Sequence, residues 1–251
     1  VKCWGTNIYG RLGNGKTADS GRPVNVVGLS SGVVQIASYA KFSCAVTTAG
    51  TVKCWGTNWS DSLGNRSSAD HSSKPVSVKG ISGATSVVVG YEHACAVIEG
   101  GEVKCWGSNS DGQLGDGSTD DSAAPVAVQG LAAPVSSLYS SGWNTCAVTE
   151  THLLECWGGM DGSPEVVEVA NSPQDVATVA MADSEGCVVT TSGAMKCGAS
   201  ETFTERLKSV PGISSKVVAV AIGMERTCTR VDSGAVECWK GAGNPTPGPG
   251  L

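Results

Sequence analysis

The sequence predicts an all-β protein built from tandem four-stranded antiparallel units, and three observations support this fold class. The 251-residue chain contains 34 glycines among many Val, Ser and Thr residues. Glycine supplies turn geometry, and β-branched side chains suit a pleated strand. The pattern Cys-Ala-Val, a turn with Gly, and Val-Lys-Cys-Trp-Gly recurs, with its first cysteine at 44, 95, 146, 187 and 228. The resulting periods of 51, 51, 41 and 41 residues are the size of propeller blades.

Each unit carries four strand signals in the same order. In the second unit they lie at residues 75–78, 85–89, 94–98 and 103–107, and the order repeats in residues 23–56, 125–158, 164–198 and 207–239. Proline at the head of the first strand fits an edge position, where a missing N–H costs no ladder bond. We therefore expect about five complete blades plus an extra N-terminal strand at residues 1–5. The propeller domain spans 1–240, and the Pro/Gly-rich residues 241–251 form a linker or tail.

The spacing of the cysteines predicts one hairpin disulfide per blade. Centring the first hairpin on Ala49 places Cys44 opposite Cys54 on one face, within disulfide reach. The same spacing of ten residues predicts the pairs Cys44–Cys54, Cys95–Cys105, Cys146–Cys156, Cys187–Cys197 and Cys228–Cys238. Structural zinc sites favour two to four residues between ligands, so metal binding fits less well, and reduced packing cysteines are the other alternative. Five bridges predict an oxidising, extracellular compartment.

Cys3 is left over because its hairpin partner would precede Val1. Three interpretations remain open: a free thiol, an intermolecular disulfide, or a hairpin that truncation has divided. The chain begins at Val1 rather than Met, which we interpret as a processed or trimmed product. The unpaired first strand also suggests head-to-tail self-association with an exposed sheet edge of another subunit.

The repeat itself resembles a known family. Residues 103–117, followed by Ala-Pro-Val-Ala-Val at 124–128, resemble the repeat of the regulator of chromosome condensation superfamily, as do residues 4–15, 55–64 and 87–97. The resemblance is good over residues 1–158 and weak over 159–240. It implies a β-propeller, typically of seven blades that strands from the two chain ends close. Nuclear members act on a small GTPase and on chromatin, whereas secreted bacterial members inhibit β-lactamase by binding it, and this second precedent fits the cysteines better.

Composition and motifs exclude several classes of function. A formal charge of −6 and a pI near 5.1 disfavour nucleic acid, which needs a basic face. No run approaches 18 apolar residues, so no membrane span is predicted. The three histidines, His71, His93 and His152, show no metal-ligand spacing, and His93 fills a position of the family repeat. The sequence therefore predicts no enzyme activity, cofactor or metal site.

Candidate contact residues are those that break the repeat. Trp4, Trp55, Trp106, Trp157 and Trp239 share one slot, which indicates blade packing. Trp59, Trp143 and Tyr9 lie outside that slot and are candidates for contact with a ligand or partner. The acidic loop with Asp116, Asp120 and Asp121 lacks EF-hand spacing, so a solvated loop is expected. Asn58 and Asn65 each begin a glycosylation sequon. These features predict a non-catalytic extracellular protein-interaction or structural module, with a carbohydrate-binding propeller as the alternative.

Overall fold

The computed structural model describes residues 1–159, 164–169, 172–182, 185–199, 207–223, 226–240 and 246–247. The chain divides into two units, which are described separately. Unit 1 comprises Val1–Thr145 and Trp157–Val166, and unit 2 comprises Cys146–Cys156 and Val167–Leu251. Among the described residues, no helix is long and apolar enough to cross a membrane.

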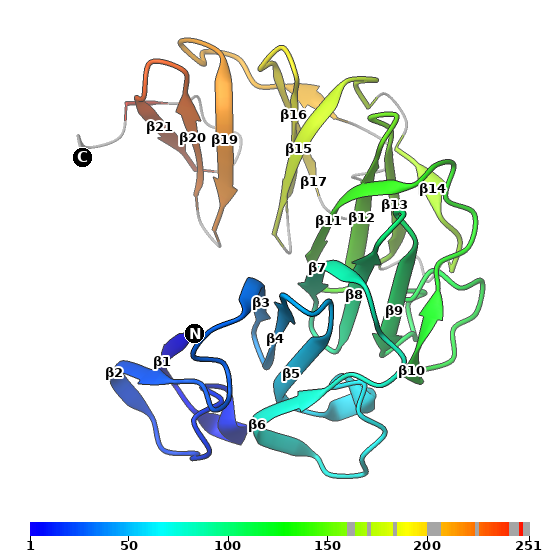
Figure 1. The fold of residues 1–251 in the computed structure, drawn as a ribbon. Helices are drawn as coiled ribbons and strands as arrows, with labels where there is room; N and C mark the ends of the chain where they lie inside the picture. Colours follow the sequence, from blue (N-terminus) through cyan, green and yellow to red (C-terminus); the bar gives the residue numbers. More distant parts are fainter. Residues whose placement is uncertain are drawn as a thin grey trace. The chain divides into compact units, whose positions relative to one another are not determined.

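Unit 1 contains a two-stranded sheet followed by two four-stranded sheets (Figure 1). The two-stranded sheet pairs β1 (Lys2–Gly5) with β2 (Ser20–Asn25). The first four-stranded sheet comprises β3 (Val33–Tyr39), β4 (Phe42–Thr47), β5 (Val52–Thr57) and β6 (His71–Ser77). The second comprises β7 (Ala84–Val89), β8 (His93–Ile98), β9 (Val103–Gly107) and β10 (Ser122–Ala127). Two short 3-10 helices, η1 (Ile8–Gly10) and η2 (Trp59–Asp61), follow β1 and β5.

Three further four-stranded sheets follow along the chain. The third comprises β11 (Val135–Ser141), β12 (Asn144–Thr149), β13 (Leu154–Gly158) and β14 (Val167–Glu168). The fourth comprises β15 (Val176–Met181), β16 (Glu185–Thr190), β17 (Met195–Ala199) and β18 (Lys208–Ser209). The fifth comprises β19 (Val217–Ile222), β20 (Thr227–Val231), β21 (Val236–Trp239) and β22 (Thr246–Pro247). Five antiparallel blades with an extra N-terminal strand are thus confirmed.

The structure groups the strands differently from the units read along the sequence. Each proline-led strand pairs with the Cys-Trp-Gly strand before it, as β2 does with β1 and β6 with β5. The N-terminal strand therefore has a partner, with Cys3 opposite Val24. A periodic pattern does not say where its unit begins, and only hydrogen bonding decides this. The proline-led strands β2, β6 and β10 do lie at sheet edges, where the missing N–H of proline costs no ladder bond.

One hairpin disulfide per blade is confirmed. The β4–β5 register sets Cys44 opposite Cys54 and Val46 opposite Val52, as centring the hairpin on Ala49 requires. Equivalent registers place the cysteine pairs of β8–β9, β16–β17 and β20–β21 opposite each other. The joined pairs are Cys44–Cys54, Cys95–Cys105, Cys146–Cys156, Cys187–Cys197 and Cys228–Cys238. Cys3 is a free, half-buried thiol, and burial raises its pKa.

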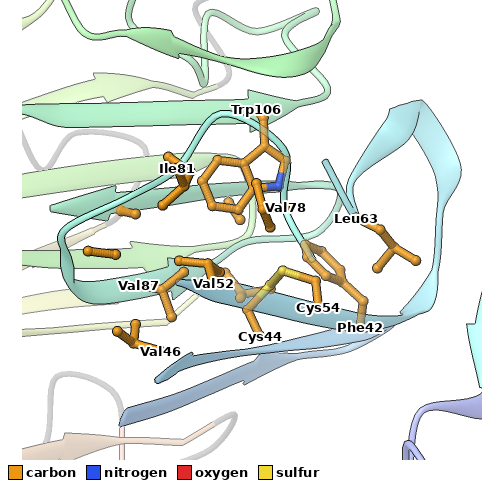
Figure 2. Close-up of a cluster of buried hydrophobic side chains, with 14 residues drawn as sticks. Phe42, Cys44, Val46, Val52, Cys54, Leu63, Val78, Ile81, Val87 and Trp106 are labelled. Atoms are coloured by element: carbon orange, nitrogen blue, oxygen red, sulfur yellow. A yellow bond between two sulfur atoms is a disulfide. The ribbon is translucent and has the colours of Figure 1, made fainter. Parts of the chain in front are cut away.

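A buried cluster joins the first two four-stranded sheets (Figure 2). It packs Val46 and Val52 of the first sheet against Val87 and Trp106 of the second. The Trp106 indole N–H also donates to the backbone oxygen of Ser62, at 3.0 Å.

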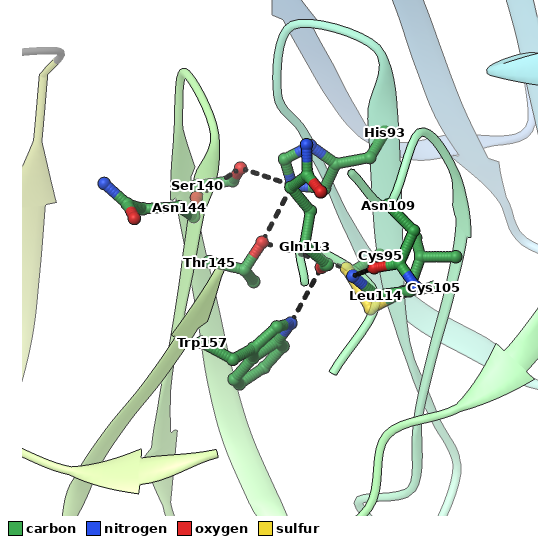
Figure 3. Close-up of a disulfide and its surroundings, with 10 residues drawn as sticks. All are labelled: His93, Cys95, Cys105, Asn109, Gln113, Leu114, Ser140, Asn144, Thr145 and Trp157. Carbon is green, nitrogen blue, oxygen red and sulfur yellow. Dashed lines mark hydrogen bonds between the residues drawn. A yellow bond between two sulfur atoms is a disulfide. The ribbon is translucent and has the colours of Figure 1, made fainter. Parts of the chain in front are cut away.

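This hydrogen bond repeats between successive sheets. Trp55 donates to the Arg11 oxygen at 2.8 Å, and Trp157 donates to the Gln113 oxygen at 2.9 Å (Figure 3). Each acceptor precedes a Leu-Gly pair in the loop between the last two strands of its sheet, so this loop of one sheet holds the tryptophan of the next. At Trp55, Trp106 and Trp157, the shared tryptophan slot therefore serves packing.

Candidate functional site

Several turns and loops of unit 1 share one end of its sheets. In an antiparallel sheet, the turn between the first and second strands and the loop after the third strand emerge at the same end. In this chain those segments are the turns after β3, β7 and β11 and the loops that carry η1 and η2. Residues that are far apart in the sequence therefore meet there.

An aromatic cluster forms where η1, η2 and β6 meet. The ring centroids of Tyr9 and Trp59 lie 5.7 Å apart in an edge-on arrangement, and those of Tyr9 and His71 lie 5.9 Å apart. The side chains stay accessible, since Trp59 is 39% exposed and Tyr9 37% exposed. Two aromatic residues that the sequence singled out separately thus form one surface.

An ion pair connects this cluster to the neighbouring turns. The Lys41 ammonium lies 4.3 Å from the centroid of the Trp59 ring and 2.6 Å from Glu92 Oε1. Ser60 Oγ donates to the other carboxylate oxygen of Glu92, at 3.5 Å. A cation over an indole contributes about 0.5–1 kcal/mol, and the ion pair holds the ammonium in that place. The positive charge of Lys41 and the negative charge of Glu92 cancel, so this ion pair adds charged groups to the surface but no net charge.

A second aromatic group continues the surface across three blades. Tyr39 lies edge-on to Tyr91 at 5.1 Å, and Tyr91 lies 5.0 Å from Trp143. Tyr39 is two residues from Lys41, and Tyr91 precedes Glu92. The two groups therefore occupy the same turns, and we call them together the turn-face patch: Tyr9, Tyr39, Lys41, Trp59, His71, Tyr91, Glu92 and Trp143.

The backbone beneath the patch is strained. Tyr9, Ser60 and Asp61 have φ values of 59°, 49° and 58°, in the left-handed region that L-residues rarely adopt. Asp61 occupies the slot that Gly10 and Gly112 fill in the neighbouring repeats. Strain of this kind costs about 1–3 kcal/mol per residue and is concentrated at functional sites. The strained residues therefore lie in η1 and η2, the two segments that carry Tyr9 and Trp59.

Sequence reasoning found Tyr9, Trp59 and Trp143 but missed the residues that connect them. Tyr39, Tyr91 and Trp143 follow one another at intervals of 52 residues, so an aromatic residue recurs in the same turn of the first three repeats. This recurrence was the available signal. The role of Lys41 and Glu92 had no such signal, because it depends on the contact between two blades.

The imidazole of His93 has structural partners at its Nε2 atom, whereas its Nδ1 atom has no hydrogen-bond partner within the described part of the chain. His93 is buried, and its Nε2 lies 2.9 Å from Thr145 Oγ1 and 3.4 Å from Ser140 Oγ (Figure 3). Burial lowers the His93 pKa to about 4, so the ring is neutral near pH 7. In unit 2, Glu185 lies close to Cys187 and Cys197, but the disulfide between these cysteines removes both thiolates as metal ligands.

Comparison with known proteins shows that parts of the chain match models of one repeat family. Two models of the regulator of chromosome condensation (RCC1) repeat match the chain, one at residues 33–60 and 84–113 and the other at 3–46 and 100–148. The chain is 36% identical to the human E3 ubiquitin-protein ligase HERC2 over 164 residues. It is 32% identical to the Arabidopsis thaliana ultraviolet-B receptor UVR8 over 162 residues. These matches cover 62% and 63% of the chain but only 3% and 37% of the two relatives.

Solved structures share the fold at low sequence identity. Human WBSCR16 superposes with a TM-score of 0.84 at 17% identity, over 99% of this chain and 79% of that protein. Prp20p from Saccharomyces cerevisiae gives 0.55 at 16% identity, over 95% and 80%. The ectodomain of the Arabidopsis thaliana receptor kinase ACR4 gives 0.56 at 16% identity, over 90% and 70%.

Proposed function

We propose that this chain, which matches models of the RCC1 repeat over part of its length, is a non-catalytic extracellular module that binds a protein partner through the turn-face patch. The observation that carries the proposal is the presence of contacting aromatic and ionic side chains on the turns of three successive blades. Tryptophan and tyrosine dominate the binding energy of protein interfaces, because they bury a large area with few rotatable bonds. Trp59 and Tyr9 remain exposed enough to make such contacts.

Relatives and structural neighbours support binding as the function of the fold. Structures exist of Prp20p, described with its binding to Gsp1p and histones, and of yeast RCC1 bound to Kap60. Gsp1p, histones and Kap60 are partners of the yeast proteins, and we do not assign them to this chain. In this chain, the net charge of −6 disfavours polyanions, and the neutral patch suits a partner surface that presents apolar side chains with a few polar groups.

The five disulfides support the extracellular part of the proposal. Hairpin disulfides persist in oxidising compartments and are rare in the cytosol. The same fold occurs in the ACR4 ectodomain. To test this point, the chain is isolated from its native source and alkylated either before or after reduction of its disulfides. Its mass then gives the number of cysteines that react in each case. We expect ten of the eleven cysteines to react only after reduction. Alkylation of all eleven cysteines in the unreduced protein would contradict an extracellular location.

A quantitative binding experiment tests the patch. The purified chain is used to capture partners from the medium and membrane fractions of its source. The affinity of each captured protein is then measured for the wild-type chain and for the Trp59→Ala variant. We expect the affinity to fall at least about tenfold, or 1.4 kcal/mol. Val218→Ala is the control, because Val218 is 40% exposed and lies outside the patch. Equal affinity of the wild type and Trp59→Ala rules out the patch. A glycan array tests the carbohydrate alternative, which predicts sugar binding that Trp59→Ala abolishes.

A different surface supports self-association as a second role. Among the described residues, β1 pairs only with β2, so its other edge is open. Beside it lies a groove of about 430 Å³ lined by Cys3, Trp4, Leu12 and Phe42, among other residues. Trp4 is 63% exposed, whereas Trp55 and Trp106 in the same repeat slot are 0% exposed. We propose that the open edge pairs with a strand of a second copy.

Size-exclusion chromatography with light scattering tests the second role. We expect a concentration-dependent dimer that Trp4→Ala weakens, and a reducible fraction that Cys3→Ser removes. A protein that is monomeric at every concentration, with a fully alkylatable Cys3, would exclude it.

A further inference from the structure

We propose that Asn65 is an N-glycosylation site and that Asn58, which begins a sequon of the same form, is closed to modification. Both sequons, Asn58-Trp-Ser and Asn65-Arg-Ser, lie between β5 and β6. The inference rests on the extracellular location proposed above, because the modification occurs in the secretory pathway.

The amide of Asn58 is fully used in holding its loop. Its Nδ2 donates to the backbone oxygens of Ser67 and Ala69, at 2.9 and 2.8 Å. Its Oδ1 accepts a hydrogen bond from the Leu63 N–H at 3.0 Å. Only 7% of the residue is exposed. A sugar on Nδ2 would remove one of these two donors and would have to fit inside the closed loop.

The neighbouring repeats show why asparagine stands at this position. Asn7 and Asn109 are equivalent residues, and neither begins a sequon. Both are 0% exposed. The Oδ1 of each accepts from the N–H of the equivalent leucine, Leu12 or Leu114. The Nδ2 of each donates to backbone oxygens of its own loop: Lys16 and Ala18 for Asn7, and Ser118 for Asn109. The loop therefore requires an amide with its nitrogen free of substituents, and the sequon at Asn58 is incidental.

Asn65 has a different role, which needs only its oxygen. Its Oδ1 accepts from the Ser67 N–H at 3.1 Å. The equivalent residues Asn14 and Asp116 accept from the N–H two residues on in the same way, at 3.0 Å each. Asp116 has no amide nitrogen, so the turn forms without one. Within the part of the chain that the structure describes, no hydrogen bond engages Asn65 Nδ2. The residue is partly exposed, and the neighbouring Arg66 is exposed.

The reaction at Asn65 is a glycosyl transfer from a lipid-pyrophosphate-linked oligosaccharide. The Nδ2 nitrogen forms a bond to C1 of the first sugar and loses one proton. The bond from C1 to the pyrophosphate oxygen breaks, and the lipid pyrophosphate leaves with its electron pair. The product amide keeps its oxygen free for the Ser67 N–H, so the turn survives the modification.

Two matched variants separate the sequons. Asn65→Asp copies Asp116 of the next repeat. It removes the amide nitrogen that would accept the glycan and keeps the oxygen that accepts the hydrogen bond. Ser60→Ala removes the first sequon and leaves Asn58 in place. Each chain is expressed behind a secretory leader in eukaryotic cells. Glycans are then mapped by mass spectrometry after enzymatic deglycosylation in ¹⁸O water, on both secreted and cell-retained protein.

We expect one glycan, at Asn65, in the wild type and in Ser60→Ala. Asn65→Asp should lose it while keeping its disulfides and its β-sheet circular dichroism. A glycan on Asn58 of folded protein, or an unmodified Asn65 in the wild type, would overturn the proposal. The appended leader supplies the compartment, so this result is independent of the alkylation experiment that tests the native location.

Discussion

Replacing Trp106 with phenylalanine tests the contact that joins successive blades. Trp106 is 0% exposed, and its indole N–H donates to the Ser62 oxygen at 3.0 Å. Phenylalanine has no donor, so the buried oxygen loses its partner, at a cost of about 1–3 kcal/mol. The smaller ring leaves a void beside Val78 and Ile81, which adds about 1 kcal/mol. We therefore expect the free energy of unfolding to fall by about 2–4 kcal/mol.

The chain supplies its own control for this substitution. Trp4 occupies the same slot of the repeat and is 63% exposed. At a protein concentration where the chain is monomeric, Trp4→Phe should change the free energy of unfolding by less than about 0.5 kcal/mol, as is usual at a surface position. Equilibrium urea unfolding of the disulfide-intact proteins, followed by far-ultraviolet circular dichroism, measures both variants. A loss below about 0.5 kcal/mol for Trp106→Phe, or equal losses for the two variants, would refute the inter-blade role.

Three other perturbations have defined outcomes. Burial depresses the folded-state pKa of His93 from 6.5 to about 4, so its stability contribution is complete above pH 6.5 and is lost as the pH falls towards 4. Between pH 7 and pH 5, the free energy of unfolding should fall by about 2 kcal/mol in the wild type, and His93→Gln should abolish this fall. The same dependence of the free energy of unfolding on pH in the variant would contradict this. Asp61→Gly should relieve the left-handed strain and raise the unfolding free energy by about 1 kcal/mol in urea, whereas a decrease would show that Asp61 has a stabilising contact. Replacing Cys95 and Cys105 with alanine should cost about 2–3 kcal/mol in the same assay, and an unchanged midpoint would contradict the role of the bridge.

The sequence by itself determined the blade count and the disulfides. The spacing of ten residues between Cys44 and Cys54, centred on a Gly-bearing turn, permits one antiparallel register, and that register sets the two sulfurs on one face. Strand alternation and turn chemistry are local, so they can be read from neighbouring residues.

Only the tertiary structure decided what the repeats bring together. A repeating pattern has no intrinsic start, so the pairing of β1 with β2 depended on hydrogen bonds between strands about twenty residues apart. Lys41 meets Glu92 because successive blades stack, and it meets Trp59 because two loops of its own blade share one end of the sheet. No local pattern encodes these contacts. The two sequons look alike along the chain. The structure separates them, because the loop surrounds Asn58 and leaves the Asn65 nitrogen free.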